Sequence, residues 1–299
     1  MPEFLDSRIS NRVVERNLQT RDLLTYASHR QHTMKLLSAA AADVAQAESA
    51  SISILGAGNC LDIDLRALTK WFRTISLLDL DRTAVEHGPG TQLPDDDAEA
   101  ASWRGVVRLI APCDLAAPLA SLRPEDFADS CHVDRICDAL VAPFEPVPVD
   151  LADVVVSTCL LSQMIDGLAL LSSHEHPQFV SLLQALRRGH FRRMLQLLKP
   201  GGQGIFISDL VSSESTPVLQ EVSEPSLPQL LARCLSSGNF FSGLNPGIVV
   251  KELTSCSELC SECCDIQVQA PWRWQMGPRI YAVYAVTFRR RPGEASSGK

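Results

Sequence analysis

The sequence has no hydrophobic run long enough to cross a membrane. The longest candidate, Val154 to Ile165, has 12 uncharged residues, several of them polar, whereas a membrane-spanning helix needs about 20 mostly apolar residues. The N-terminus, MPEFLDSRISNRVVERN, alternates charges and lacks the apolar segment of a secretory signal peptide. We therefore expect a cytoplasmic protein with no membrane partner.

An excess of basic charge is also missing. The chain has 27 Lys and Arg against 35 Asp and Glu, and its net charge is −8. Because a phosphate backbone would be repelled except at a local basic patch, this balance disfavours nucleic acid as a partner. Ten cysteines without an export signal favour reduced thiols in a cytosol over a disulfide framework.

What the sequence does contain is a stretch, Ser51 to Asp81, with the pattern of a strand, a glycine turn, a helix and a second strand. An apolar run from Ile52 to Leu55 precedes Gly56-Ala57-Gly58, and a second run from Ile75 ends at Asp79. Between them, apolar residues recur at a helical spacing: Leu61, Leu65, Leu68 and Phe72. The pattern predicts a βαβ unit whose helix starts near Asn59 or Cys60.

Each part of this unit suits a nucleotide. Gly56 and Gly58 allow a tight turn and a close approach of the backbone to a ligand. Asp79 comes 21 residues after Gly58, the distance at which an acid on the next strand meets the hydroxyls of a ribose. The unit therefore predicts recognition of an adenosine cofactor.

The fingerprints of two other nucleotide sites are incomplete here. A dinucleotide fingerprint would have its third glycine at Leu61, and the Gly-Lys-Ser/Thr of a phosphate-binding P-loop is absent. The unit instead resembles motif I of the class I S-adenosylmethionine-dependent methyltransferases, with GAGNC in place of the commoner GxGxG. An NAD or FAD site, or a Rossmann unit that binds no ligand, remains an alternative.

Later segments resemble the same family in the same order. Asp114 follows a third predicted strand, and the resemblance places it at the adenine amino group, although it could instead only cap the next turn. The segment DVVVSTCLLSQMI resembles motif IV, with Ser162 and Gln163 where many members have two histidines. LLKPGG precedes a fifth predicted strand, Gly204 to Ser208, as is typical of the family.

The resemblance implies an α/β fold. It is a Rossmann-like, doubly wound, mostly parallel seven-stranded sheet of order 3-2-1-4-5-7-6 whose last strand is antiparallel. The closing hairpin is predicted at 266–270 and 279–289. We expect a helical cap over 1–48, the methyltransferase domain over 49–291 and a disordered tail over 292–299. Further expected elements are a loop over 88–102 and helices over 124–140, 177–198, 227–236 and 249–262.

The implied function is transfer of a methyl group from S-adenosylmethionine to an O or N nucleophile of a small-molecule acceptor, leaving S-adenosylhomocysteine. The residues expected to bind the cofactor are Gly56, Ala57, Gly58, Asn59, Asp79, Leu80, Asp114, Leu115, Ser157, Thr158, Cys159 and Arg30. The alternatives are a non-catalytic, methyltransferase-like binding protein and an NAD(P)-dependent oxidoreductase. The acceptor and the oligomeric state are not evident from the sequence.

Several polar groups are candidates for a role in catalysis. His174, His176 and Asp209 lie where the family binds its acceptor, and any of them could act as a base or contact the substrate. A plain polar loop is the alternative for the two histidines. Arg30 could pair with the methionine carboxylate of the cofactor, or it could be a solvated residue of a surface helix.

Two further groups of residues have simpler interpretations. Cys256, Cys260, Cys263 and Cys264 include a CxxxCxxC spacing, which we interpret as the apolar face of a helix. No metal is expected there. Trp272 and Trp274 are expected to pack in the core or in a lid.

Overall fold

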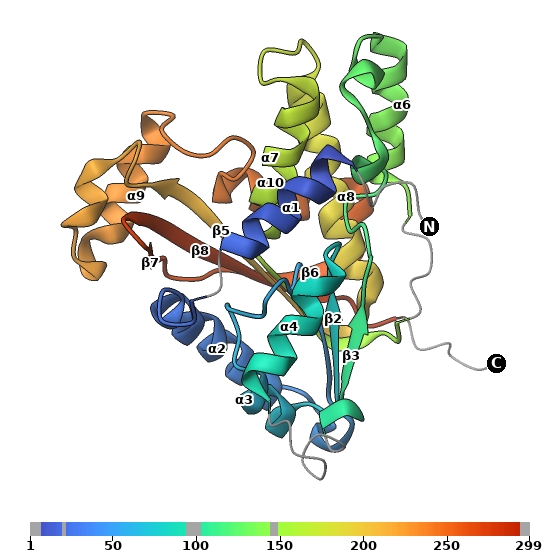
Figure 1. Ribbon diagram of the computed structural model, residues 1–299, viewed down its shortest axis with the longest axis vertical. Coiled ribbons are helices and arrows are strands. Elements are labelled where there is room, and N and C mark those ends of the chain that lie inside the picture. Colours follow the sequence, from blue (N-terminus) through green and yellow to red (C-terminus); the bar gives the residue numbers. More distant parts are fainter. Residues whose placement is uncertain (1–6, 20–21, 94–102, 144–148, 294–299) are drawn as a thin grey trace.

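The computed structural model of the chain describes residues 7–19, 22–93, 103–143 and 149–293. Its centre is a mixed sheet of order β3-β2-β1-β4-β5-β8-β6, in which β7 also pairs with β8 (Figure 1). The strands are β1 Ser51–Leu55, β2 Thr74–Leu78, β3 Val107–Ile110, β4 Ala152–Thr158, β5 Leu198–Ser212, β6 Cys263–Val268, β7 Trp272–Met276 and β8 Arg279–Arg290. Strands β1 to β5 run parallel to one another, and β8 is antiparallel to β5. The predicted fold class is therefore confirmed, with β7 as an additional strand.

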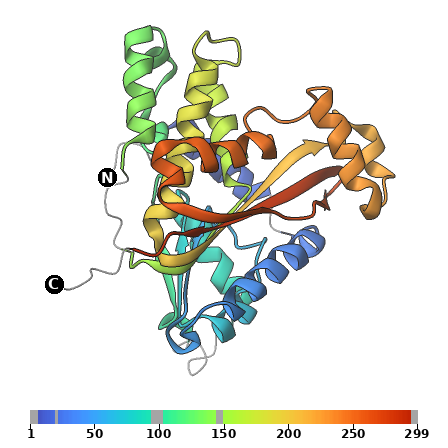
Figure 2. The ribbon, with the colours of Figure 1, turned by 180° about the vertical axis from the view of Figure 1, so that it is seen from behind.

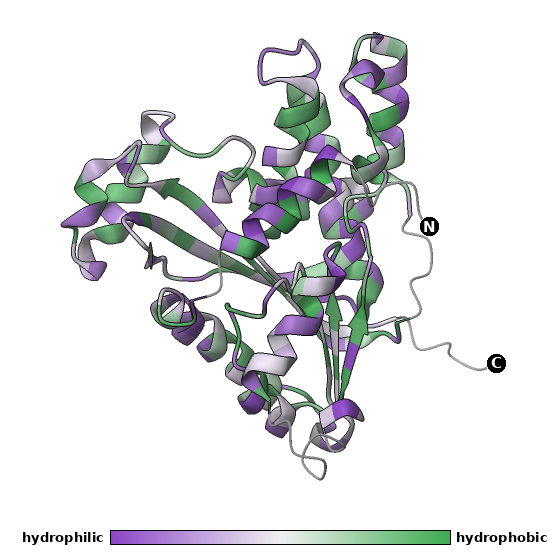
Figure 3. Cartoon of the chain, in the orientation of Figure 1, coloured by the Kyte–Doolittle hydropathy of each residue, from purple (hydrophilic) through white to green (hydrophobic). Residues whose placement is uncertain are grey.

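The central strands are apolar because helices cover both faces of the sheet. Val155 packs in one hydrophobic cluster, and its neighbours Val154 and Val156 pack in the other. Successive side chains of a strand point to opposite faces, so an unbroken run of valines serves both clusters. Figure 3 shows hydrophobic residues following the strands while the helices carry both kinds.

The helices divide between the two faces (Figures 1 and 2). One cluster contains residues of α2 Ala27–Ala42, α3 Leu65–Trp71 and α4 Arg82–Gln92. The other contains residues of α1 Arg8–Gln19, α6 Ser130–Val141, α7 Leu160–Ser172, α8 Phe179–Leu197, α9 Leu227–Ser236, α10 Pro246–Ser255 and α11 Ser257–Cys260. None of these helices combines the length and the apolar content needed to cross a membrane.

The helix after the glycine turn starts later than the predicted Asn59 or Cys60. It begins at Leu65, because Asp64 is its N-cap and its carboxylate accepts a hydrogen bond of 3.0 Å from the backbone N–H of Ala67. Leu61 is buried, but it lies in the loop before the helix. The helix dipole therefore starts seven residues beyond Gly58 and not at the turn itself.

Other boundaries also differ from the predictions. Gly88 to Gln92 belong to α4 and not to a loop, and residues 94–102 lie outside the described part of the chain. The expected helix over 124–140 is divided into a 3₁₀ turn, Pro124–Phe127, and α6. LKPGG lies inside β5 as an irregularity, where the pairing partner of β4 moves from Leu198 to Gln203.

The interpretation of the four C-terminal cysteines as one helix face is wrong. Cys256 caps the end of α10 and Cys260 ends α11, whereas Cys263 and Cys264 lie on strand β6. Only Cys263 is buried, and its thiol lies 3.2 Å from the carbonyl oxygen of Leu253. Among the described residues, no three His, Cys, Asp or Glu side chains group so as to hold a metal.

Candidate functional site

The glycine turn after β1 is tied to the end of β2. The backbone N–H groups of Gly56 and Ala57 both donate to the carbonyl oxygen of Leu78, over 2.9 and 3.2 Å. Gly56 has φ +71°, and a Cβ on it would lie 2.8 Å from Cδ1 of Leu160. This position therefore requires glycine both for its conformation and for its packing against α7.

Asp79, at the tip of β2, is held by the same turn. Its carboxylate accepts hydrogen bonds of 2.8 Å from the backbone N–H groups of Gly58 and Asp81. Burial raises the pKa of this carboxyl to about 6, although the two backbone donors act in the opposite direction. Each carboxylate oxygen has a further lone pair with which it can accept a hydroxyl group.

Of the two roles expected for Asp114, the structure shows the capping role. It caps the turn that follows β3, because its carboxylate accepts from the N–H groups of Ala116 and Ala120 over 2.9 and 3.0 Å. It also lines a cavity. Burial raises the pKa of Asp114, and nearby Arg193 partly offsets the shift.

That narrow cavity, about 60 Å³, lies at the carboxyl ends of β1, β2 and β3. We call it the first cavity. Gly56, Asp79, Leu80, Asp114 and Leu115 all line it, although they come from three separate parts of the sequence. Such a position, at the ends of parallel strands, is where open α/β sheets bind ligands.

A second cavity, about 580 Å³, lies beside the first, and Gln163 of α7 lines both. Cys159, Ser162, His174 and Asp209 line the second cavity. Cys159 follows β4 with φ +48°, and its backbone N–H donates to the carbonyl oxygen of Ile207 over 2.9 Å. The end of β4 is therefore fixed against β5 at the point where the cavities meet.

Asp209 is the buried acid of the second cavity. Only 9% of its surface is exposed, and its Oδ1 is buried without a hydrogen-bond partner. Burial raises the pKa of this carboxyl, which a hydrogen bond from Ser162 partly offsets. An acid with a raised pKa and a free acceptor atom can take a proton from a bound molecule.

Helix α1 separates the two cavities. Ile9 and Val13, one turn apart, line the first, and Arg12 and Arg16 line the second. The next turn seals the glycine loop, because Nδ2 of Asn59 donates to the carbonyl oxygen of Asn17 over 2.7 Å. The sequence predicted a helical cap over 1–48 but did not indicate these four cavity-lining residues, although apolar and basic pairs at i, i+4 spacing could have suggested them.

Four other predicted site residues line neither of the two cavities. Ser157 and Thr158 are fully buried, and the Oγ of Ser157 lies 3.0 Å from Nε2 of His190. Arg30 lines neither cavity, and its Nε donates to the carbonyl oxygen of Leu61 over 2.9 Å. His176 also lines neither, and its Nε2 lies 3.0 Å from the carbonyl oxygen of Phe127. The structure thus brings His174 and Asp209 to one cavity, without His176.

The outer wall of the second cavity is formed by aromatic side chains that the sequence did not indicate as a group. Trp274 lies between Tyr26 and Tyr281, with ring centroids 5.1 and 5.4 Å apart. All three rings line the cavity, together with Phe241. Trp272 is buried behind this wall, and its Nε1 donates to Nδ1 of His29 over 3.2 Å.

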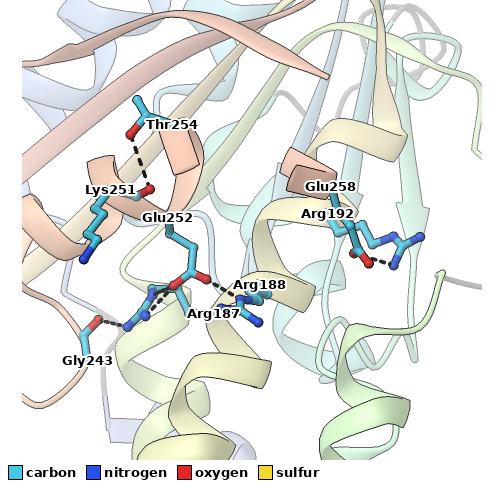
Figure 4. Close-up of polar contacts among 8 residues, drawn as sticks. All are labelled: Arg187, Arg188, Arg192, Gly243, Lys251, Glu252, Thr254 and Glu258. Carbon is cyan, nitrogen blue, oxygen red and sulfur yellow. Dashed lines mark hydrogen bonds and ion pairs between the residues drawn. The ribbon is translucent and has the colours of Figure 1, made fainter. Parts of the chain in front are cut away.

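The segment 240–244 closes the same cavity and is anchored from behind (Figure 4). Arg187 of α8 donates to the carbonyl oxygen of Gly243 over 3.2 Å, and its Nε donates to Glu252 of α10 over 2.9 Å. Arg188 pairs with the other oxygen of Glu252. A buried ion pair therefore positions one wall of the cavity.

No family model matches this chain, and no curated protein matches it. Among solved structures, the N-methyltransferase NodS from Bradyrhizobium japonicum is 12% identical, with a TM-score of 0.41 over 88% of this chain and 96% of NodS. The plantazolicin methyltransferase BpumL, solved with S-adenosylhomocysteine, is 8% identical, with a TM-score of 0.44 over 97% and 93%. The CurJ carbon methyltransferase is 10% identical, with a TM-score of 0.43 over 88% and 54%. Likeness of this degree assigns neither a ligand nor a reaction to this chain.

Proposed function

We propose that this chain is an S-adenosylmethionine-dependent methyltransferase that acts on an O or N nucleophile of a small-molecule acceptor. The observation that carries the proposal is the convergence of Gly56, Asp79 and Asp114 on one cavity that adjoins a larger one. The sequence predicts a cofactor contact for each of these three residues. Such a pair of adjoining cavities suits a two-substrate transfer.

The residues that line the first cavity supply acceptors suited to the adenosine part of the cofactor, and this cavity, at about 60 Å³, would have to widen to hold it. Asp79 offers a carboxylate with unused lone pairs for the ribose hydroxyls, and Asp114 is near enough to accept from an adenine amino group. The glycine turn adopts a positive φ at Gly56 and Gly58, which brings the backbone close to the end of β2. Bound S-adenosylmethionine supplies a methyl group on a positively charged sulfur, which is already an activated leaving group.

The remaining chemical tasks belong to the second cavity. Cys159 and Ser162 line the second cavity close in sequence to Gln163, which lines both cavities, and Asp209 can accept the proton that an acceptor O–H or N–H loses. The main contribution to rate is alignment of the acceptor with the methyl group and exclusion of water, an effect that can reach about 7 to 11 kcal/mol. The ten cysteines, none of them in a disulfide, support a reducing, cytoplasmic environment for this reaction.

Parallel calorimetric titrations with S-adenosylmethionine, S-adenosylhomocysteine and NAD test the proposal. We expect micromolar binding of the first two and none of NAD, and weaker binding by an Asp114→Ala variant. Binding of NAD alone would favour an oxidoreductase. Failure of all three to bind would favour a methyltransferase-like protein without a cofactor, and either result refutes the proposal.

A further inference from the structure

We propose that the acceptor is a planar aromatic compound, neutral or anionic, that presents a hydroxyl or amino group to Asp209. This inference rests on the proposed function and concerns the second cavity alone. At about 580 Å³, the cavity has the volume of a typical small-molecule site. Three features of its lining select the chemical class.

The first feature is a continuous aromatic wall. From Tyr26 the rings continue through Trp274 and Tyr281 to Phe241, whose centroid lies 6.3 Å from that of Tyr281. Spacings of this size are those at which aromatic rings attract one another in offset or tilted arrangements. A flat acceptor placed against this wall gains the same kind of contact, whereas a saturated ring cannot.

The second feature is the charge around the cavity. Three guanidinium groups line it, those of Arg12, Arg16 and Arg279, against two carboxylates, those of Asp166 and Asp209. Arg16 pairs with Asp166 over 2.9 Å, so this part of the mouth is internally balanced. The aromatic faces could attract a cation, but Arg279 already lies over the Tyr281 ring at 5.0 Å. Arg279 also pairs with Glu214, and Arg12 lies 3.6 Å from Asp166. At the aromatic wall itself, away from Asp209, a further cation would meet the Arg279 guanidinium, which an anionic group would instead approach favourably.

The third feature is the unpartnered acceptor atom of Asp209. Its Oδ1 is buried without a hydrogen-bond partner, and a buried acceptor atom left in this state destabilises the folded protein. A hydroxyl or amino group on the ligand would supply the missing donor. The same contact would place the nucleophile near Cys159 and Ser162, at the junction with the first cavity.

Three probes separate these features without any substitution. They are 3-hydroxybenzoate, its saturated analogue 3-hydroxycyclohexanecarboxylate, and tyramine, which is aromatic but cationic. Binding is measured by calorimetry on the full chain, with and without S-adenosylhomocysteine. We expect 3-hydroxybenzoate to bind about tenfold more tightly than either of the others, because only it satisfies both the aromatic wall and the charge. Equal binding of the saturated analogue, preferred binding of tyramine, or no binding of 3-hydroxybenzoate would overturn the inference.

Variants locate the binding. Tyr281→Leu should weaken 3-hydroxybenzoate binding about tenfold, and the matched control Trp103→Leu, an aromatic residue that lines neither cavity, should not. Asp209→Asn should retain binding of the probe. A loss of 3-hydroxybenzoate binding in Trp103→Leu as large as that in Tyr281→Leu would contradict the assignment of this binding to the second cavity. The proposed function fails independently, if neither S-adenosylmethionine nor S-adenosylhomocysteine binds while 3-hydroxybenzoate does.

Discussion

The side-chain amide of Asn17 donates a hydrogen bond of 3.0 Å to the carboxylate of Asp81, 64 residues away in the sequence. Asp81 is also the N-cap of α4, and its other oxygen accepts from the N–H of Ala84 over 3.2 Å. This one contact therefore joins α1, the first cavity and the helix after β2. Removing this hydrogen bond therefore tests whether it holds α1 over the glycine turn.

We expect Asn17→Ala to loosen α1. A hydrogen bond to a charged group contributes about 1.5 to 3 kcal/mol, and its loss should accelerate amide hydrogen exchange in residues 8–19 relative to the sheet. Asn11→Ala, on the exposed side of the same helix, is the matched control. Equal acceleration in both variants would show that Asn17 does not hold the helix.

Asp79 should make cofactor affinity depend on pH. Burial raises the pKa of its carboxyl to about 6, and the ionised form is the stronger acceptor for ribose hydroxyls. S-adenosylhomocysteine affinity should therefore fall as pH is lowered through about 6. Asp79→Asn should bind more weakly at neutral pH and lose this dependence. Asp62 also has its pKa raised to about 6, so Asp62→Asn is the control that should keep the dependence.

The same shift has the opposite sign for stability without ligand. The folded pKa of Asp79 exceeds its unfolded value of about 4, so the folded state binds the proton more tightly. Its contribution to stability is largest below pH 4 and is lost as pH rises towards 6. In urea unfolding, the free energy of unfolding at pH 4.5 minus that at pH 7 should therefore be smaller for Asp79→Asn than for the wild type, and an equal value in both would contradict the raised pKa.

Gly56→Ala should destabilise the fold by about 1 to 3 kcal/mol. The added Cβ would lie 2.8 Å from Leu160 at φ +71°, so contact and conformation both oppose it. Gly90→Ala is the control, because nothing lies within 4 Å of the added atom and the residue is in α4. Alanine there should be neutral or stabilising. Comparable losses in chemical unfolding would refute the packing argument.

Glu252→Gln should cost about 3 to 5 kcal/mol, because it leaves the buried Arg187 guanidinium without its counter-charge (Figure 4). Glu258→Gln removes a similar pair, with Arg192 at 3.1 Å, but this pair is exposed and should be nearly neutral. Because Arg187 also donates to Gly243, Glu252→Gln should weaken 3-hydroxybenzoate binding more than S-adenosylhomocysteine binding. A uniform loss of both would indicate only a general destabilisation.

The sheet was predictable because its signals are local. The apolar runs of β1, β2 and β4 are each buried on both faces and could be read within five to seven residues. The start of α3 was not, because Leu61 is buried in a loop at a spacing that imitates a helix turn, and the cap at Asp64 decides the boundary. Strand β7 was missed because its five residues acquire a strand partner only through β8.

The candidate site was predictable where one residue stands at the end of one strand. Asp79 and Asp114 are positions of this kind. A helical cap was predicted, but the residues with which α1 contacts the site were not predictable, because these contacts are set by tertiary structure: Arg16 meets Asp166 across 150 residues. The aromatic wall combines Tyr26, Phe241, Trp274 and Tyr281 from distant segments, so no local spacing could indicate it.

Helix α1 lines both cavities from one face, with Ile9 and Val13 at the first cavity and Arg12 and Arg16 at the second. A molecule that displaces Val13 also displaces Arg12 and Arg16, because these residues belong to the same two turns. Binding in either cavity should therefore change the affinity of the other, and thermodynamic reciprocity requires the two changes to be the same factor. In such an arrangement the two ligands affect each other through a single turn of helix, in addition to their direct contact at the transferred methyl group.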